Sequence, residues 1–301
     1  MAVHPTRAST FSYYLSSSSD KIIEPPETQK ASQSIVSCLH QASIGAYWRN
    51  VTIMWSKNLM NYSMSVVVDG NLTDTQYTCK VDLKPWHFWS KKGFKAFDVE
   101  GAEVEVYWDL RSAKFSTSPE PISDYYVALV SDGEVVLLLG DMKKKVFKRT
   151  KSRPALVHAV LCQKTEHVFA KRTFSTRAVL DQRQEKVYDI VVESSTIGHK
   201  DPEMWISIDG VVLIHVKNLQ WKFRGNQTVM VNKQSVQVFW DVHDWLFVSP
   251  CDGHGMFIFK PIDADAETDA ESANGSDRNY HSAFAKPSPD YCLFLYAWKI
   301  E

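Results

Sequence analysis

The sequence predicts an all-β protein, an antiparallel β-sandwich or barrel made of two similar β-units. Many short apolar runs lie about 8–12 residues apart along the 301-residue chain, the spacing typical of sandwiches and barrels. Asp-Gly dipeptides, which favour tight hairpin turns, follow or join several of these runs. Because long helical periodicity is absent, the pattern disfavours a helical bundle or an α/β fold.

The first half of the chain contains six predicted strands. They are residues 51–55, 62–68, 77–83, 102–108, 125–130 and 134–139. Asp69-Gly70 ends the second of these runs, and Asp132-Gly133 joins the last two into a hairpin. Polar and apolar side chains alternate in residues 102–107. This alternation places Glu103 and Glu105 on one face of the strand and the valines between and after them on the other.

The second half of the chain also contains short predicted strands separated by turn signals. Its predicted strands are residues 187–192, 204–208, 211–216, 235–240 and 256–259. Asp209-Gly210 marks a second hairpin, and residues 234–239 alternate as a strand with one solvated face. Weak helical patterns occur only at residues 35–41, 141–148 and 155–162.

An ordered set of landmarks occurs twice in the chain. Each copy contains a strand, an Asp-Gly turn, a second strand, Trp-x-Phe, a basic loop, a third strand and an aromatic-Trp-Asp triplet. Trp86 and Trp108 of the first copy correspond to Trp221 and Trp240 of the second. We interpret this as an internal repeat that arose by duplication, with the tryptophans placed chiefly in the core. The alternative is that β-proteins reuse such turns and aromatic residues by chance.

Composition divides the chain into five predicted regions. Residues 1–34 form a Ser- and Pro-rich disordered arm, 35–140 a first β-unit, 141–186 a basic connector with linking strands, 187–260 a second β-unit, and 261–301 an acidic linker with an apolar C-terminal segment. The apolar segment at residues 291–300 has two alternatives, an added strand or a partner-binding segment.

Basic residues form the most suggestive cluster on the predicted surface. The formal net charge is only -1, but residues 141–153 contain seven basic side chains against Asp141, and residues 261–290 are acidic. The candidate binding residues are Lys143, Lys144, Lys145, Lys148, Arg149, Lys91, Lys92 and Arg224. They predict contact with a protein partner or an anionic surface. The alternative is a solvated connector between the two units, and the acidic segment is a candidate mask for it.

Catalytic and metal-binding signatures are scarce. The chain contains no G-x-S-x-G, H-E-x-x-H, P-loop or G-x-G-x-x-G motif, so we expect no cofactor and favour a non-enzymatic role. His243, Cys251 and His254 are the nearest approach to a zinc site, but they lack a second ligand pair at a fixed spacing. Cys162 beside His158 and His167 is better explained as core than as a nucleophile. Glu103 and Glu105 are better explained as a solvated strand face than as an acid/base pair.

Five scattered cysteines without a C-x-x-C motif predict a reducing compartment, cytoplasmic or nuclear. Met1 to Asp20 lacks the apolar stretch of a secretory signal. A run of about 18 apolar residues is also missing, so we expect no transmembrane helix.

Several segments of the chain, taken in order, carry a family resemblance. They include Trp55-Ser-Lys-Asn-Leu59, Cys79-Lys-Val-Asp-Leu-Lys-Pro-Trp86, Tyr107-Trp-Asp-Leu110, Leu137-Leu-Leu-Gly-Asp141, Trp221-Lys-Phe-Arg-Gly-Asn226 and Phe239-Trp-Asp-Val-His243. In this order they resemble the family called domain of unknown function 868, from about Ile35 to Phe259. The resemblance implies a plant protein but no activity and no catalytic residue. After Lys260 we expect the chain to depart from the family pattern.

These observations predict a non-enzymatic binding or interaction module. The alternative is a barrel that binds a small ligand or a carbohydrate, possibly with hydrolytic activity, in which a Trp-Asp pair offers a carboxylate beside an aromatic platform. The exposure of Trp86, Trp108, Trp221 and Trp240 distinguishes the two, because a sugar site needs such rings in an open pocket and a structural role buries them.

Overall fold

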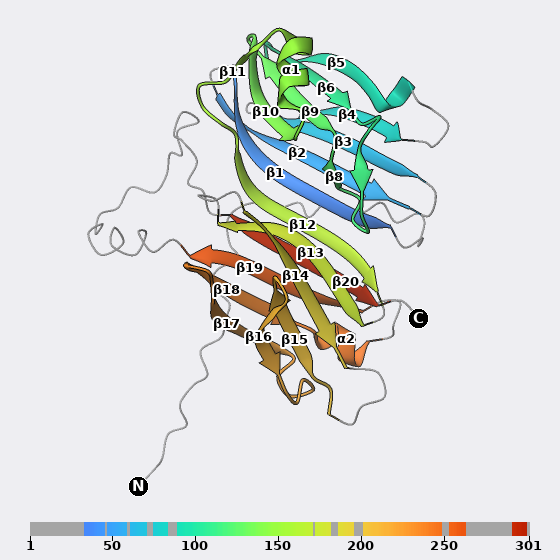
Figure 1. Ribbon diagram of the computed structural model, residues 1–301, viewed down its shortest axis with the longest axis vertical. Coiled ribbons are helices and arrows are strands. Elements are labelled where there is room, and N and C mark those ends of the chain that lie inside the picture. The colour runs from blue at the N-terminus through green and yellow to red at the C-terminus, as the bar shows by residue number, and fades with distance from the viewer. Residues whose placement is uncertain are drawn as a thin grey trace, which may run out of the picture. The chain divides into compact units, whose positions relative to one another are not determined.

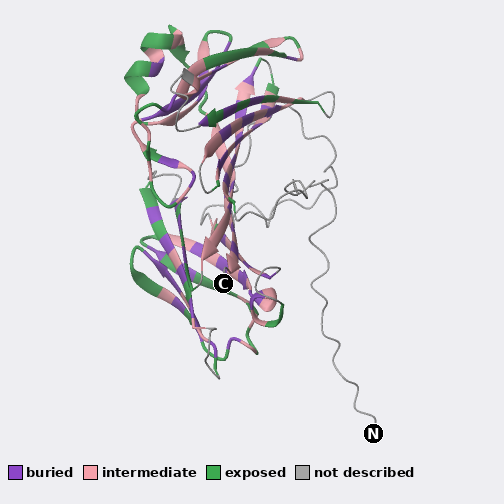
Figure 2. Cartoon of the chain, turned by 90° about the vertical axis from the view of Figure 1, so that its right-hand side faces the viewer, coloured by how far each residue is buried: buried purple, intermediate pink, exposed green. Residues whose placement is uncertain are grey.

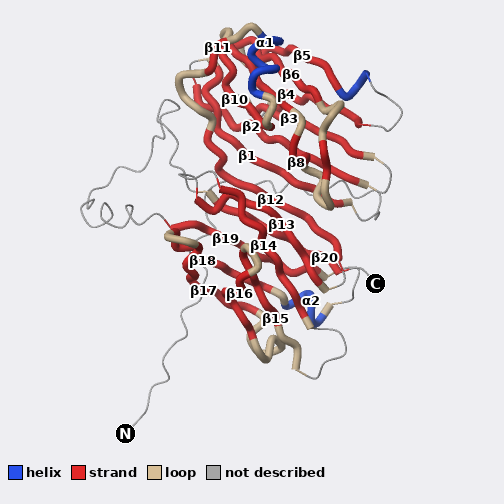
Figure 3. Tube along the Cα trace, in the orientation of Figure 1, coloured by secondary structure: helices blue, strands red, loops and turns tan. Residues whose placement is uncertain are grey.

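The computed structural model contains two β-sandwiches that share one long sheet. It describes residues 33–45, 47–58, 61–70, 75–83, 89–170, 172–181, 186–195, 201–248, 253–262 and 291–299. Strands make up most of this part of the chain, and the helices in it are short (Figure 3). The predicted all-β, antiparallel class is therefore confirmed. The described sheets do not close into a barrel.

The long sheet has nine strands. In spatial order they are β17 (Arg224–Val231), β18 (Gln234–Asp241), β19 (His254–Ile262), β20 (Cys292–Lys299), β12 (Val160–Ala170), β1 (Ser34–Ile44), β2 (Tyr47–Lys57), β3 (Tyr62–Asp69) and β4 (Gln76–Leu83) (Figure 1). β12 pairs antiparallel with β1 on one side and parallel with β20 on the other. One strand thus belongs to the sheets of both sandwiches.

Two smaller sheets cover one face of the long sheet. The first contains β11 (Arg153–Pro154), β10 (Glu134–Gly140), β9 (Tyr126–Ser131), β6 (Ala102–Asp109) and β5 (Lys92–Val99). The second contains β13 (Thr173–Asp181), β14 (Lys186–Ser194), β15 (Met204–Ile208) and β16 (Val211–Val216). The short strands β7 (Lys114–Phe115) and β8 (Pro121–Ser123) form a separate pair.

Each sandwich has its own hydrophobic core. β1 to β4 face β5, β6, β9 and β10 across the first core, and β17 to β20 face β13 to β16 across the second. β13 lies within the predicted connector and β20 within the predicted tail, yet both contribute buried side chains to the second core, for example Phe174 and Leu295. Of the two alternatives for the apolar C-terminal segment, the structure therefore has the added strand.

Two of the predicted hairpins form as their sequences indicate. Asp132 and Gly133 have φ angles of 52° and 71°, and Asp209 and Gly210 have 49° and 79°. Positive φ at both central residues is the type I′ geometry that Asp-Gly favours. The weak helical pattern at residues 141–148 corresponds largely to helix α1 (Lys143–Thr150). The pattern at residues 35–41 was misleading, because these residues lie in β1, where burial alternates strictly.

The repeated landmarks make matching contacts in the two sandwiches. The Trp108 indole donates to the Ser90 carbonyl (2.9 Å), and the Trp240 indole donates to the Lys222 carbonyl (3.1 Å). A glycine lies against each indole, Gly93 in the first sandwich and Gly225 in the second. A Cβ at Gly93 would lie 2.6 Å from Trp108, so only glycine allows this approach. The internal repeat stays a prediction, which these paired contacts support.

Candidate functional site

Helix α1 lies on the outer face of the five-stranded sheet, over β9 and β10 (Figure 1). The side chains of alternate residues of β9 point to opposite faces of this sheet. Val127 and Leu129 face the first core, and Tyr126, Ala128 and Val130 face α1. Val146 is the residue of α1 that is fully buried among them. This explains why β9 is buried along its whole length, and it fixes a short polar helix to a rigid support.

Five of the predicted binding residues gather on this helix. Lys143, Lys144, Lys145, Lys148 and Arg149 are all exposed, and the cartoon in Figure 2 colours most of α1 green, for exposed residues. Within the described residues, none of the five has a carboxylate within ion-pair distance. The nearest acidic residue in sequence, Asp141, instead accepts the backbone N–H groups of Asp124 (3.0 Å) and Tyr125 (3.2 Å). These bonds, that of Asp124 first, hold the pKa of Asp141 below its usual range. We call these five residues the α1 basic cluster.

Three of the five charges of the α1 basic cluster oppose the helix dipole, while Lys148 and Arg149 lie in the last turn, where positive charge is favourable. Three lysines occupy the first turn, where the helix has its positive end, and that turn contains no acidic residue. The N-cap residue, Met142, makes no side-chain capping bond. Both features cost helix stability, and both raise the positive potential at this end of α1. An anionic group bound here would relieve the repulsion.

An aromatic pair borders the α1 basic cluster. The Arg149 guanidinium carbon lies 5.9 Å from the centre of the Tyr107 ring, and the Phe94 ring stacks on Tyr107 at 5.6 Å. Phe94 is 58% exposed. The sequence analysis did not propose these two as site residues. The alternation in residues 102–107 was the available signal, because it places Tyr107 on the face of Glu103 and Glu105.

The other predicted basic residues lie on other elements than α1. Lys92 on β5 is 3.9 Å from Asp109, which also holds Arg111 in a two-point ion pair (2.9 and 2.8 Å). Burial raises the pKa of Asp109, but the hydrogen bonds and charge of Arg111 outweigh it and lower the pKa. Lys91 ends a short 3-10 turn, η1 (Trp89–Lys91).

Arg224 begins β17 in the second sandwich, where it pairs with Asp241 at 2.6 Å. The structure therefore brings together the five residues of α1 and leaves Arg224 outside that face.

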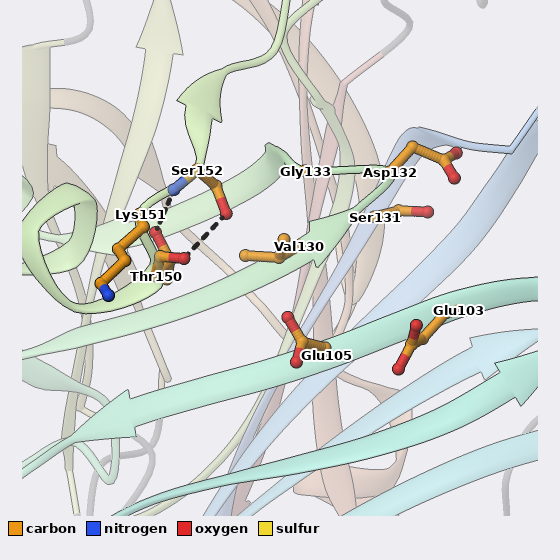
Figure 4. A pocket seen from close by; sticks show the side chains of 9 residues that line it. All are labelled: Glu103, Glu105, Val130, Ser131, Asp132, Gly133, Thr150, Lys151 and Ser152. Carbon is orange, nitrogen blue, oxygen red and sulfur yellow. Dashed lines mark hydrogen bonds between the residues drawn. The ribbon is translucent and has the colours of Figure 1, made fainter.

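A cavity of about 310 Å³ lies beside the C-terminal end of α1 (Figure 4). Glu103 and Glu105 project from β6 on one side of it, and Thr150, Lys151 and Ser152 lie on the other. The Tyr107 hydroxyl donates to Glu105 (3.1 Å). The basic helix is thus bordered by carboxylates on the same face of the sheet.

Comparison with known proteins assigns the chain to a family. A family model described as plant protein of unknown function (DUF868) matches residues 31–299. The chain belongs to the DUF868 family. The match continues well past Lys260, so the expectation that the family pattern ends there was wrong. β20 explains the extension, because it supplies a central strand to the second core. No curated protein and no solved structure matches the chain.

The tryptophans of this DUF868 member do not share one environment. Trp240 is 9% exposed in the second core, and Trp108 packs partly buried against the first. Trp221 is 82% exposed, so the interpretation of the tryptophans as core was wrong there. Trp86 lies outside the described residues. The cavity beside α1 has no tryptophan in its lining.

The structure of this family member gives no support to the zinc site or the cysteine nucleophile considered from the sequence. His243 Nδ1 lies 2.9 Å from Asp244, and Cys251 lies outside the described residues. The described part of the chain contains no group of three or more His, Cys, Asp or Glu placed to hold a metal ion. Burial, before any other cause, raises the pKa of the Cys162 thiol, which disfavours the nucleophilic thiolate. Among the described helices, none is long and apolar enough to cross a membrane.

Proposed function

We propose that the protein is a non-enzymatic binding module that holds an acidic segment of a partner protein against the α1 basic cluster. The observation that carries this proposal is a set of five exposed basic side chains on a helix anchored by Val146, none of which has a carboxylate within ion-pair distance in the described residues. Because the helix backbone is already held in place, only the side chains lose freedom on binding, which favours recognition over transient attraction. The reducing cytoplasm or nucleus is the compartment we propose for it.

The surroundings of α1 favour a short acidic segment over an extended polyanion. Glu103 and Asp132 are exposed beside the helix, and Glu105 is partly exposed there. A nucleic acid or a membrane surface extends beyond one helix of eight residues and would meet these carboxylates as well. An acidic peptide is small enough to contact the basic cluster alone, and the exposed Phe94 offers an apolar contact at its border.

Reversing two charges of the cluster tests the proposal. In the Lys144→Glu/Lys148→Glu variant, we expect the affinity for a fluorescein-labelled hexaglutamate peptide to fall at least about tenfold at low ionic strength, because each reversal replaces an attraction of about 1 kcal/mol with a repulsion. Fluorescence anisotropy measures the binding. The wild-type affinity should also fall as salt is added, since exposed charges are screened.

The matched control is Lys80→Glu/Lys217→Glu, which makes the same charge change at exposed positions on other elements. It should bind the peptide nearly as the wild type does. If both variants lost the same affinity for the peptide, the loss would be due to net charge alone, and this result would contradict the proposal. Anionic vesicles or duplex DNA that bind more tightly than the peptide, and lose binding only in the α1 variant, would show that the partner class is wrong.

The carbohydrate-binding alternative finds little support. The described sheets form filled sandwiches in place of a barrel, and Trp108 and Trp240 are held by carbonyl hydrogen bonds on the inner side. Trp221 is the exposed ring among the described candidates, and it lies in the turn before β17.

A further inference from the structure

The two edges of the nine-stranded sheet are protected unequally. β4 forms one edge, and side chains cap two of its outward carbonyls: Lys95 Nζ donates to Thr78 (3.0 Å) and Ser90 Oγ donates to Asp82 (2.9 Å). β4 also carries the exposed charges of Lys80 and Asp82. Charged side chains and caps of this kind keep an edge strand from pairing with another chain.

β17 forms the other edge and lacks these devices. Its ladder with β18 runs from Arg224 to Val231 without a register shift, so no bulge twists the edge away. Residues 225–231 contain no proline and no charged side chain. No side chain in the described part of the chain donates to a β17 carbonyl. An edge of this length without protection is a template for one more strand.

The hydrogen-bond register identifies the outward backbone groups of β17. The Val242 amide donates to the Phe223 carbonyl (2.8 Å), so residue 223 faces β18. Because direction alternates along an antiparallel strand, odd-numbered residues of β17 also face β18 and even-numbered residues face away. The outward residues are Arg224, Asn226, Thr228 and Met230, and all four are exposed. The backbone N–H and C=O groups of each of these residues point away from β18, toward the position of an added strand.

The charges at the ends of β17 disfavour a second copy of this chain as the added strand. A second copy paired through β17 would bring residues 222–233, which contain no carboxylate, and would leave the lysines at the two ends, Lys222 and Lys233, without an opposite charge. Both lysines are exposed. A segment with a carboxylate at each end would instead complement them. The exposed rings of Trp221 and Phe247, 82% and 56% accessible, lie in the segments that flank β17 and β18 and provide apolar contact beyond the strand.

We propose that β17 is a docking edge for an extended segment of a partner protein, which adds as a strand and places acidic residues at Lys222 and Lys233. This is the β-augmentation mode of peptide recognition, in which backbone bonds give affinity and the ends give specificity. The site belongs to the second sandwich and does not depend on the proposed role of α1.

The Thr228→Pro substitution distinguishes a docking role of β17 from a purely structural one. Proline at an outward position of an edge strand removes an N–H that makes no bond within the sheet, so Thr228→Pro should fold with its β18 pairing intact. Thr228→Val is the matched control, because it keeps the N–H and the strand preference. Circular dichroism and the thermal midpoint establish that both variants are folded.

The probe is a capped twelve-residue peptide with aspartate at each end and alternating valine and threonine between, because Lys222 to Lys233 is twelve residues of extended chain. We expect it to bind the wild type and Thr228→Val alike, and to lose at least about tenfold in affinity for Thr228→Pro. Hydrogen exchange read by NMR should show about tenfold or greater added protection at the amides of Asn226, Thr228 and Met230, and little change at the odd-numbered residues.

Three results would overturn the proposal. The first is equal binding of the peptide to the proline variant. The second is full protection of the outward amides before peptide is added. The third is a wild-type dimer in sedimentation that Thr228→Pro dissociates, because it would make the occupant a second copy. The Lys144→Glu/Lys148→Glu variant should lose binding of hexaglutamate and still bind the strand peptide. This result would show that the α1 basic cluster and the β17 edge are independent sites.

Discussion

Replacing Lys164 by methionine is expected to lower the free energy of unfolding by about 3–5 kcal/mol. Lys164 projects from the shared strand β12 and is buried, with Nζ 2.8 Å from Glu166, 2.9 Å from Glu120 and 2.7 Å from the Arg177 carbonyl. Glu166 is 2% exposed, so the variant leaves a buried carboxylate without its cation. Such an uncompensated charge costs more than the ion pair itself contributed.

The loss should depend on pH in a way that identifies its cause. Burial alone would lower the pKa of Lys164, but Glu120 and Glu166 hold that pKa well above its usual value. A raised pKa stabilises the fold below the unfolded value of about 10.4, so in the wild type this contribution is constant between pH 5 and 8. The variant lacks this contribution, and a buried carboxylate without a cation is costly in its charged form. The difference in stability should therefore be smaller at pH 5 than at pH 8.

Urea unfolding of the wild type, Lys164→Met and Lys164→Met/Glu166→Gln measures both effects. The double variant removes the unpaired charge and should recover a large part of the loss. A single variant that is as stable as the wild type at pH 8, or a double variant less stable than the single, would contradict this account of the buried ion cluster.

Replacing Trp240 by alanine is expected to cost about 3–5 kcal/mol, the usual range for removing a buried tryptophan. The variant loses core packing, leaves the Lys222 carbonyl without its donor and opens a cavity beside Gly225. Trp108→Ala removes the matching indole from the first sandwich, where the ring is more exposed, and should cost less.

Because the two rings belong to different cores, their effects should add in the Trp108→Ala/Trp240→Ala variant within about 0.5 kcal/mol. Denaturant unfolding, followed at several wavelengths to test for two-state behaviour, measures all three variants. Strong non-additivity would contradict this prediction, because it would show that the two rings are energetically coupled.

Local patterns predicted much of this fold, and the exceptions have physical reasons. Alternation in residues 102–107 and the Asp-Gly turns gave β6 and two hairpins, because strand faces and turn geometry are encoded within a few residues. The shared strand β12 was beyond such reasoning. Its inward positions hold Lys164 and Glu166, which look solvated in sequence, and its partner β20 lies more than a hundred residues further along the chain.

The candidate site was predicted in part. The basic residues of α1 are adjacent in sequence, so their clustering needed no knowledge of the fold. The separation of Arg224 from α1, and the approach of Phe94 and Tyr107 to Arg149, depend on strand pairing. The open edge of β17 depends on the order of strands in the sheet, which no local pattern contains.

The position of β20 between β19 and β12 has a consequence for biosynthesis. The first sandwich takes its strands from residues up to β12 and can begin to assemble while the rest of the chain is still being translated. The second cannot close until the ribosome has released residues 292–299, because until then β19 and β12 both have an unpaired side. A nascent chain that stalls before this point would expose the unpaired edges of β19 and β12, which are prone to aggregation. At this stage the protein would most need a chaperone.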